Sequence, residues 1–245
     1  MNLTGAVLAG GRSQRFGQPK ATFKLRGKPL LLYTLDALQP ICTERVVVAK
    51  PDTPLPSLPP TVRLLYDEFE TQHPLSGILT VLHHANCEWV FICAVDMPFL
   101  NPALLQWMAT LSVGPMQEYD VIVPESEGRL QPLHAFYWRK SLEKLRAIVS
   151  DWRMVLPASR MPSSPAPPFE SEGRIEANPY VCPKKHPPQA APPSASREDT
   201  LATEWLPSLQ AILRHPSLRV RVLTPDEWRI YDPEGRSFAN LNMPP

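Results

Sequence analysis

The sequence predicts an α/β protein in which a mainly parallel β-sheet is covered by helices on both faces. Short apolar segments alternate with segments of helical periodicity along the first 150 residues, which is the pattern of β-α-β units. The segment Trp89–Asp96 is apolar on both faces, as expected for a central strand of a parallel sheet. Together these two observations indicate a three-layer arrangement of helices, sheet and helices.

The N-terminal elements follow in order. Leu3–Ala9 is almost entirely apolar and predicts a buried strand, and Pro29–Leu38 has helical spacing with a proline suited to the first turn. Arg45–Lys50 is rich in β-branched residues and Val62–Asp67 is an apolar run, so both predict strands. Leu75–Ala85 has the periodicity of a helix.

The next elements continue the same alternation. After the central strand, Pro102–Leu111 predicts a helix, Tyr119–Glu125 a strand and Arg139–Val149 a further helix. Near the end of the sequence, Ala202–His215 predicts a helix and Leu218–Leu223 a strand.

Proline marks an interruption of this pattern. The chain has 31 prolines and 10 glycines, and residues from about 150 to 200 are rich in proline, serine and alanine. Such a composition buries too little apolar surface to offset the entropy lost on ordering. We therefore expect one domain spanning residues 1–245, interrupted by a flexible insertion at about 150–200.

Bulk composition excludes several classes of protein. The net charge of +1 gives no reason to expect a nucleic acid or an anionic membrane as partner. The sequence shows neither an apolar run long enough to span a membrane nor a basic leader, so we expect a cytoplasmic protein. The four cysteines have no C-x-x-C spacing, which argues against a zinc or redox motif.

The stretch "VLAGGRSQRFGQPKA" raises the question of an anion site. Glycines at 10, 11 and 17 follow the first strand together with Arg12, Arg15 and Lys20. Backbone N–H groups of such a loop can bind a phosphate, but the Walker and dinucleotide-binding spacings are both absent. From spacing alone, a phosphate site and a strand-to-loop turn with a solvated basic face are equally good interpretations.

Five segments in order resemble one enzyme family. "LAGGRSQRFGQPKA" is similar to the nucleotidyltransferase signature L-A-G-G-x-S-x-R-M-G-x-x-K. The segments "HPLSGI", "AVDMPFL", "LQPLHAFY" and "FANLNMPP" are similar to motifs of the molybdenum cofactor guanylyltransferases, a branch of that superfamily. The resemblance implies a three-layer Rossmann-like nucleotidyltransferase fold and the transfer of GMP from GTP to the terminal phosphate of molybdopterin, with release of pyrophosphate.

Position and resemblance together indicate the metal ligand. Asp96 ends the most buried strand, and Pro98 forces the chain out of the strand in an extended turn. A carboxylate there can hold Mg²⁺ beside phosphate oxygens, although a loop acid or helix cap is the alternative from position alone. The resemblance implies Mg²⁺ on Asp96 as the cofactor.

The remaining site residues are implied by the resemblance. It makes Lys20 and Arg15 catalytic together with Asp96, with Lys20 on the α-phosphate and Arg15 on the other two phosphates. The nucleotide would contact Leu8, Ala9, Gly10, Gly11, Arg15, Gly17, Lys20, Asp67, Leu75, Ser76, Gly77 and Asp96. The acceptor would contact Asn240 and Asn242.

Partners and alternatives follow from the same comparison of motifs. The implied partners are GTP and molybdopterin, together with proteins that transfer molybdopterin or mature molybdoenzymes. The alternatives are a related nucleotidyltransferase that uses CTP or a sugar-phosphate acceptor, and a non-catalytic nucleotide-binding or cofactor-chaperone protein.

The sequence departs from the family pattern at Gln18-Pro19 and at His73. We interpret His83, His84 and His134 as structural because no ligand lies at metal spacing from them in the sequence.

Overall fold

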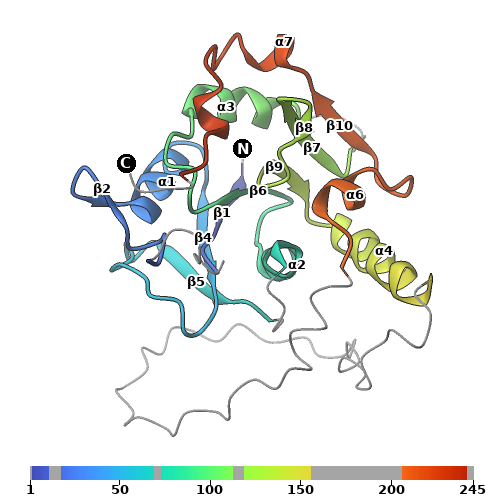
Figure 1. Ribbon diagram of the computed structural model, residues 1–245, viewed down its shortest axis with the longest axis horizontal. Helices are drawn as coiled ribbons and strands as arrows, with labels where there is room; N and C mark the ends of the chain where they lie inside the picture. The colour runs from blue at the N-terminus through green and yellow to red at the C-terminus, as the bar shows by residue number, and fades with distance from the viewer. Residues whose placement is uncertain (1, 11–17, 69–72, 113–118, 156–205, 242–245) are drawn as a thin grey trace, which may run out of the picture.

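A central β-sheet organises the chain (Figure 1). The computed structural model describes residues 2–10, 18–68, 73–112, 119–155 and 206–241, with side chains described as far as residue 151 in the fourth range. Within these residues, eight strands form one sheet in the order β10-β7-β9-β6-β1-β4-β5, with β8 paired to β7. The region of about 150–200 predicted to be a flexible insertion falls almost entirely outside the described residues.

Four parallel strands form one half of the sheet, as the sequence predicts. They are β1 (Leu3–Leu8), β4 (Glu44–Ala49), β5 (Val62–Tyr66) and β6 (Trp89–Ala94). β1 is central: it pairs with β4 on one side and with β6 on the other, both in parallel. Because β1 and β6 are covered on both faces, nearly all of their side chains are buried and apolar.

The other half of the sheet is mixed. It contains β7 (Val121–Ser126), β8 (Arg129–Leu130), β9 (His134–Trp138) and β10 (Val220–Leu223). β9 runs antiparallel to both of its neighbours, β6 and β7, whereas β10 is parallel to β7. A separate hairpin joins β2 (Lys24–Leu25) to β3 (Lys28–Pro29) through Arg26 and Gly27, both with positive φ.

Helices cover both faces of the sheet, so the predicted three-layer architecture is confirmed. One face packs against α1 (Leu30–Leu38) and α3 (Pro102–Thr110), and also receives Trp228 and Phe238 from α7 (Pro225–Trp228) and the 3₁₀ turn η2 (Arg236–Phe238). The opposite face packs against α2 (Pro74–His84), α4 (Ser141–Val155) and α6 (Leu209–Leu213). Figure 1 shows these two groups of helices on opposite sides of the strands.

The structure differs from the sequence prediction most clearly at α6. The predicted helix Ala202–His215 is reduced, within the described residues, to five residues. Ser208 has extended backbone torsions and its hydroxyl accepts a hydrogen bond from the Ala211 N–H at 3.2 Å, so it caps a helix that begins at Leu209. Pro207 precedes this cap and disfavours helical torsions at Leu206.

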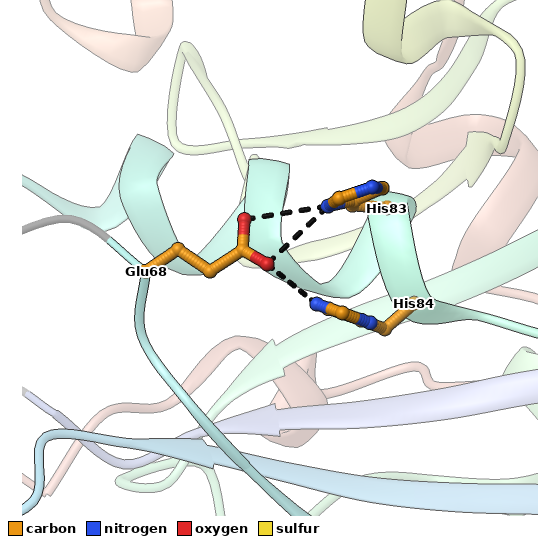
Figure 2. A group of neighbouring side chains, drawn as sticks. All are labelled: Glu68, His83 and His84. Carbon is orange, nitrogen blue, oxygen red and sulfur yellow. Dashed lines mark hydrogen bonds and ion pairs between the residues drawn. The ribbon is translucent and has the colours of Figure 1, made fainter. Parts of the chain in front are cut away.

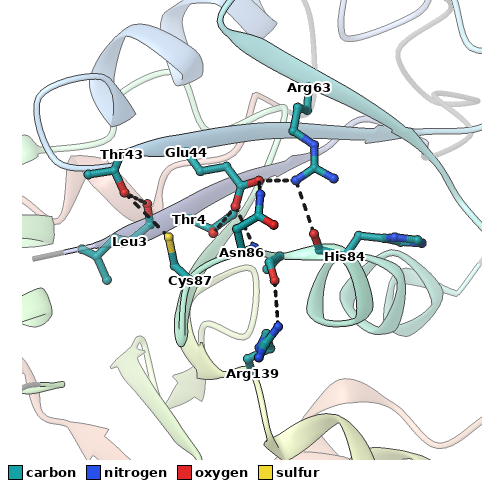
Figure 3. A network of polar contacts seen from close by, with 10 residues as sticks. Leu3, Thr4, Thr43, Glu44, Arg63, His84, Asn86, Cys87 and Arg139 are labelled. Carbon is teal, nitrogen blue, oxygen red and sulfur yellow. Dashed lines mark hydrogen bonds and ion pairs between the residues drawn. The ribbon is translucent and has the colours of Figure 1, made fainter. Parts of the chain in front are cut away.

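A polar network centred on the partly buried Glu44 joins the strands at the amino edge of the parallel sheet (Figure 3). The carboxylate of Glu44 accepts hydrogen bonds from the Thr4 hydroxyl at 2.6 Å, from the backbone N–H of Asn86 at 3.0 Å and from the Asn86 amide at 2.6 Å. Arg63 adds an ion pair to the same carboxylate. Burial acts to raise the pKa of Glu44, but the hydrogen bonds from Thr4, Asn86 and Arg63 hold it below its ordinary value. These contacts join β1, β4, β5 and the residues that follow α2.

No described helix combines the length and apolar character needed to cross a bilayer.

Candidate active site

The topology of the parallel strands selects one edge of the sheet for ligand binding. From β1 the chain passes to β4 and β5 on one side, then returns through α2 to β6 on the other side of β1. Ligands of open α/β sheets bind outside the carboxyl ends of the strands at such a reversal of order. Hydrogen bonds from Val95 N–H to the Leu8 carbonyl (3.1 Å) and from Ala9 N–H to the Val48 carbonyl (2.8 Å) keep these ends aligned. Ala9, Gly10 and Asp96 therefore lie at this edge.

An ion pair joins two predicted site residues across this edge. The Lys20 Nζ lies 2.6 Å from the Asp96 Oδ2, and both side chains are about four-fifths buried. Pro19 begins the turn that carries the lysine, because its carbonyl accepts hydrogen bonds from the Phe23 N–H and from the Thr22 hydroxyl, both at 3.2 Å. Pro19, where the sequence departs from the family pattern, thus begins the turn that contains Lys20.

The second oxygen of Asp96 has the properties of a cation ligand. Asp96 Oδ1 is buried and has no hydrogen-bond partner among the described residues. A buried carboxylate oxygen is costly without a partner, so it favours a positively charged ligand. Mg²⁺ prefers one or two carboxylates with phosphate and water oxygens, and this donor set fits it.

The C-terminal segment lies against the same aspartate. The backbone N–H of Leu241 donates to the Asp96 carbonyl at 2.9 Å, so the exposed Asn240 lies beside the candidate metal ligand. Phe238 anchors this segment by edge-on contacts with His134 and Trp228, with ring centroids 4.8 Å apart in each pair. Residues 96 and 240 are thus brought together from distant parts of the sequence.

Asp67 is the centre of a second polar cluster at this edge. Its Oδ2 accepts a hydrogen bond from the Ser76 hydroxyl at 2.7 Å and lies 3.1 Å from the Lys50 Nζ. The Thr80 hydroxyl lies 3.4 Å from its Oδ1. The side chains of Asp67 and Lys50 are 8% and 13% exposed, so a positive charge compensates a nearly buried carboxylate.

Lys50 is the site residue that sequence reasoning missed. It follows β4, which is the neighbour of β1, so its position at the carboxyl edge was the available signal. A Cβ placed on Gly10 would lie 3.5 Å from the backbone nitrogen and the Cγ of Lys50. Lys50 therefore connects the Asp67 cluster to the residues that follow β1.

A histidine caps the start of α2. The backbone of His73 is extended (φ −78°, ψ 134°), and its Nδ1 accepts a hydrogen bond from the Leu75 N–H at 3.2 Å. The histidine therefore needs no positive φ at the position where the family pattern has glycine. Burial lowers the pKa of His73, which favours the neutral ring that this acceptor role requires.

Gly77 has a packing role in the described structure. A Cβ at this position would lie 3.1 and 3.3 Å from the two methyl carbons of Leu8, closer than ordinary contact. The glycine thus lets α2 approach β1, and Leu75 and Ser76 are buried beside it.

Of the predicted site residues, Gly11, Arg15, Gly17 and Asn242 lie outside the described residues.

The mainly parallel sheet, with polar residues gathered outside the carboxyl ends of β1 and β6, has the architecture of a Rossmann-like nucleotide-binding fold. Residues 5–159 match the family model of the MobA-like NTP transferase domain, and the chain belongs to this family.

Named relatives cover most or all of the chain. A probable molybdenum cofactor guanylyltransferase of Chloroflexus aggregans is 38% identical over 250 aligned residues, which cover 100% of this chain and 91% of the relative. A molybdenum cofactor guanylyltransferase of Desulfosudis oleivorans is 36% identical over 157 residues, 64% of this chain and 75% of the relative. Molybdopterin-guanine dinucleotide biosynthesis protein A of Archaeoglobus fulgidus superposes with a TM-score of 0.61 over 98% of this chain and 93% of that protein. At 20% identity this last likeness confirms the fold.

Proposed function

We propose that the protein transfers a guanylyl group from GTP to the terminal phosphate of molybdopterin and releases pyrophosphate. The structural observation that carries this proposal is the Lys20–Asp96 pair outside β1 and β6, with an unpartnered carboxylate oxygen beside it. The choice of guanine and of molybdopterin rests on the relatives named as molybdenum cofactor guanylyltransferases.

The reaction requires positioning and charge neutralisation more than proton transfer. An oxygen of the acceptor phosphate is already anionic at neutral pH, so it can attack the α-phosphorus as the bond to the β-phosphate oxygen breaks. Catalysis of such a step depends on alignment and on positive charge around the phosphates. Lys20 supplies this charge at the α-phosphate, and Arg15 is proposed to bind the β- and γ-phosphates through its paired donors.

Asp96 is the proposed ligand of Mg²⁺. When bound, the ion neutralises phosphate charge beside the reacting phosphorus. The ammonium of Lys20 already lies on Oδ2, and Oδ1 remains available on the same carboxylate. The pair therefore holds one oxygen in place and leaves the other for a cation.

The remaining site residues are proposed to orient the two substrates. Leu8, Ala9, Gly10, Gly11 and Gly17 would contact the nucleotide through their backbone, with the Asp67 cluster and the start of α2 lining the same edge. Asn240, held beside Asp96 by the Leu241 hydrogen bond, is proposed to contact the acceptor together with Asn242.

Pyrophosphate release with GTP, molybdopterin and MgCl₂ tests the proposal. We expect release to require both substrates and to fall by at least about 100-fold in Asp96→Asn, which removes the proposed Mg²⁺ ligand, and in Lys20→Ala, which removes a positive charge at the α-phosphate. Asp36→Asn is the matched control: Asp36 is exposed, pairs with Lys28 and should keep parent activity.

Other outcomes would assign other functions. Release with CTP but not GTP would indicate a cytidylyltransferase, and release with a sugar phosphate in place of molybdopterin would change the acceptor. GTP binding without pyrophosphate release would indicate a nucleotide-binding protein that lacks transferase activity. Parent turnover in a folded Asp96→Asn variant would remove Asp96 from the metal site.

A further inference from the structure

Three potential metal ligands meet on the surface near the end of α2 (Figure 2). Glu68 lies just after β5, and His83 and His84 are the last two residues of α2. The Nδ1 of His83 lies 3.3 Å from Oε1 and 3.4 Å from Oε2 of Glu68, and the Nε2 of His84 lies 2.5 Å from Oε1. All three ligand atoms lie within 4.8 Å of one another. Figure 2 shows both rings directed at the carboxylate.

The backbone holds Glu68 against α2. Its N–H donates to the Thr80 hydroxyl at 3.2 Å, one helical turn before His83 and His84. The two rings are stacked at a tilt, with centroids 4.7 Å apart, and present different nitrogens to the same carboxylate. The arrangement thus joins residues 15 and 16 positions apart in the sequence, which is why sequence spacing showed no third ligand.

Access and local charge favour a cation. The side chains of Glu68, His83 and His84 are 32%, 50% and 39% exposed, so an ion can enter and water can complete its coordination. Arg63 contacts the His84 carbonyl at 3.3 Å, but its charge is paired with Glu44. Burial acts to raise the pKa of Glu68, whereas hydrogen bonds from His84 and His83 hold it below its ordinary value, so the carboxylate is ionised at neutral pH.

We propose that Glu68, His83 and His84 form a binding site for a divalent transition metal such as Zn²⁺. Imidazole nitrogens with one carboxylate suit Zn²⁺ and its neighbours, whereas Mg²⁺ prefers an all-oxygen shell. Zn–N and Zn–O distances of about 2.1 Å in a tetrahedron place ligand atoms about 3.4 Å apart, close to the His83–Glu68 separation. The His84–Glu68 contact must widen by about 1 Å, which rotation of exposed side chains can supply.

The site is separate from the proposed reaction centre. His83 and His84 come from the end of α2, whereas Ser76 and the capping His73 belong to the start of that helix, and the carboxylate of the third ligand, Glu68, contacts these two histidines although Glu68 directly follows Asp67 in the chain. The inference therefore does not depend on guanylyl transfer, and its test measures metal binding alone.

Titration of the chelator-treated full-length protein with ZnCl₂, followed by calorimetry, tests the site. Cys182 and His186 are replaced by serine and alanine in every protein used, because a thiol and an imidazole four residues apart could bind zinc independently. We expect one Zn²⁺ per chain, and at least a tenfold loss of affinity in His83→Ala, in His84→Ala and in Glu68→Gln. His215→Ala removes a histidine from another surface and should leave the affinity unchanged.

Titration with CoCl₂ provides a direct readout of the ligands. Visible absorption typical of Co²⁺ with nitrogen ligands should appear in the parent and be lost in His83→Ala and His84→Ala, while excess MgCl₂ should not displace the ion. Thermal unfolding of each metal-free variant checks that it is folded. Absence of Zn²⁺ binding by the parent, or equal affinity in the folded His83→Ala and His84→Ala variants, would overturn the proposal.

Discussion

Protonation of His134 should destabilise the protein at acidic pH. The ring is fully buried between Phe91 and Phe238, with centroid distances of 5.2 and 4.8 Å, and neither ring nitrogen has a hydrogen-bond partner among the described residues. Burial is the largest effect and lowers its pKa from 6.5 to about 4, while its own backbone and the charge of Asp232 act in the opposite direction. The folded protein therefore holds this histidine neutral.

The magnitude follows from the difference between these two pKa values. Below pH 6.5 the unfolded chain binds a proton that the folded chain does not, so the free energy of unfolding falls by about 1.4 kcal/mol per pH unit. The loss attributable to His134 reaches about 2 kcal/mol at pH 5 and about 3 kcal/mol at pH 4, where the folded ring also becomes protonated. Above pH 6.5 the contribution is constant.

Urea unfolding of the parent and of His134→Leu between pH 7.5 and pH 5 measures this term. Carboxylates that titrate in the same range are common to both proteins, so the difference in pH dependence isolates the histidine. The parent should lose about 2 kcal/mol more than His134→Leu over this interval. A His215→Ala control should keep the parent's pH dependence, and parallel curves for the parent and His134→Leu would refute the reasoning.

Three further substitutions test other contacts. Glu44→Gln should lower the free energy of unfolding at pH 7 by about 3 kcal/mol in urea titrations, because it removes the charge that four donors surround. The pKa of Glu44 lies below its ordinary value of 4.5, so the stability lost in Glu44→Gln should be present above pH 4.5 and should shrink as the pH falls below it. The control Glu234→Gln, at an exposed position, should change the free energy of unfolding by less than about 0.5 kcal/mol. Lys50→Met should weaken GTP binding about tenfold or more in calorimetry, because it removes the ammonium group paired with the nearly buried Asp67 carboxylate. Equal GTP affinity in Lys50→Met and in a Lys140→Met control would count against a role for the Asp67 cluster in GTP binding. Gly77→Ala should cost about 1–3 kcal/mol in thermal or urea unfolding, because the added methyl meets Leu8; parent stability would show that α2 can shift without cost.

The parallel half of the fold could be predicted because its inner strands β1, β4 and β6 are largely buried on both faces, although the edge strand β5 exposes Leu64 and Tyr66. An unbroken apolar run such as that of β6 has few alternatives, and helical spacing identified α1, α2 and α3 between the strands. The direction of β9 could not be predicted, since an apolar segment pairs equally well in either direction. The β2–β3 hairpin is too short to show any periodicity.

The residues of the candidate active site that could be predicted from the sequence are those that belong to contiguous sequence motifs. The position of Asp96 after a buried strand and the resemblance of the first loop both indicated a nucleotide site before any geometry was available. Lys50 and Asp67, 17 positions apart, meet only because β4 and β5 are neighbours in register. Their pairing is a property of the sheet and leaves no local pattern in the sequence. The assignments of individual residues to GTP, Mg²⁺ and acceptor stay predictions.

The reversed direction of β9 changes which of its flanking segments meets the substrate edge. Parallel strands present the residues that follow them, but β9 begins at that edge, so it presents the residues that precede it. The Leu133 carbonyl accepts from the Ala94 N–H at 3.3 Å, two residues before Asp96. Variation in length or sequence at 131–133 would therefore reshape the surface beside the proposed reaction centre, whereas Arg139, which follows the other end of β9, donates its backbone N–H to the Glu88 carbonyl at the opposite edge of the sheet.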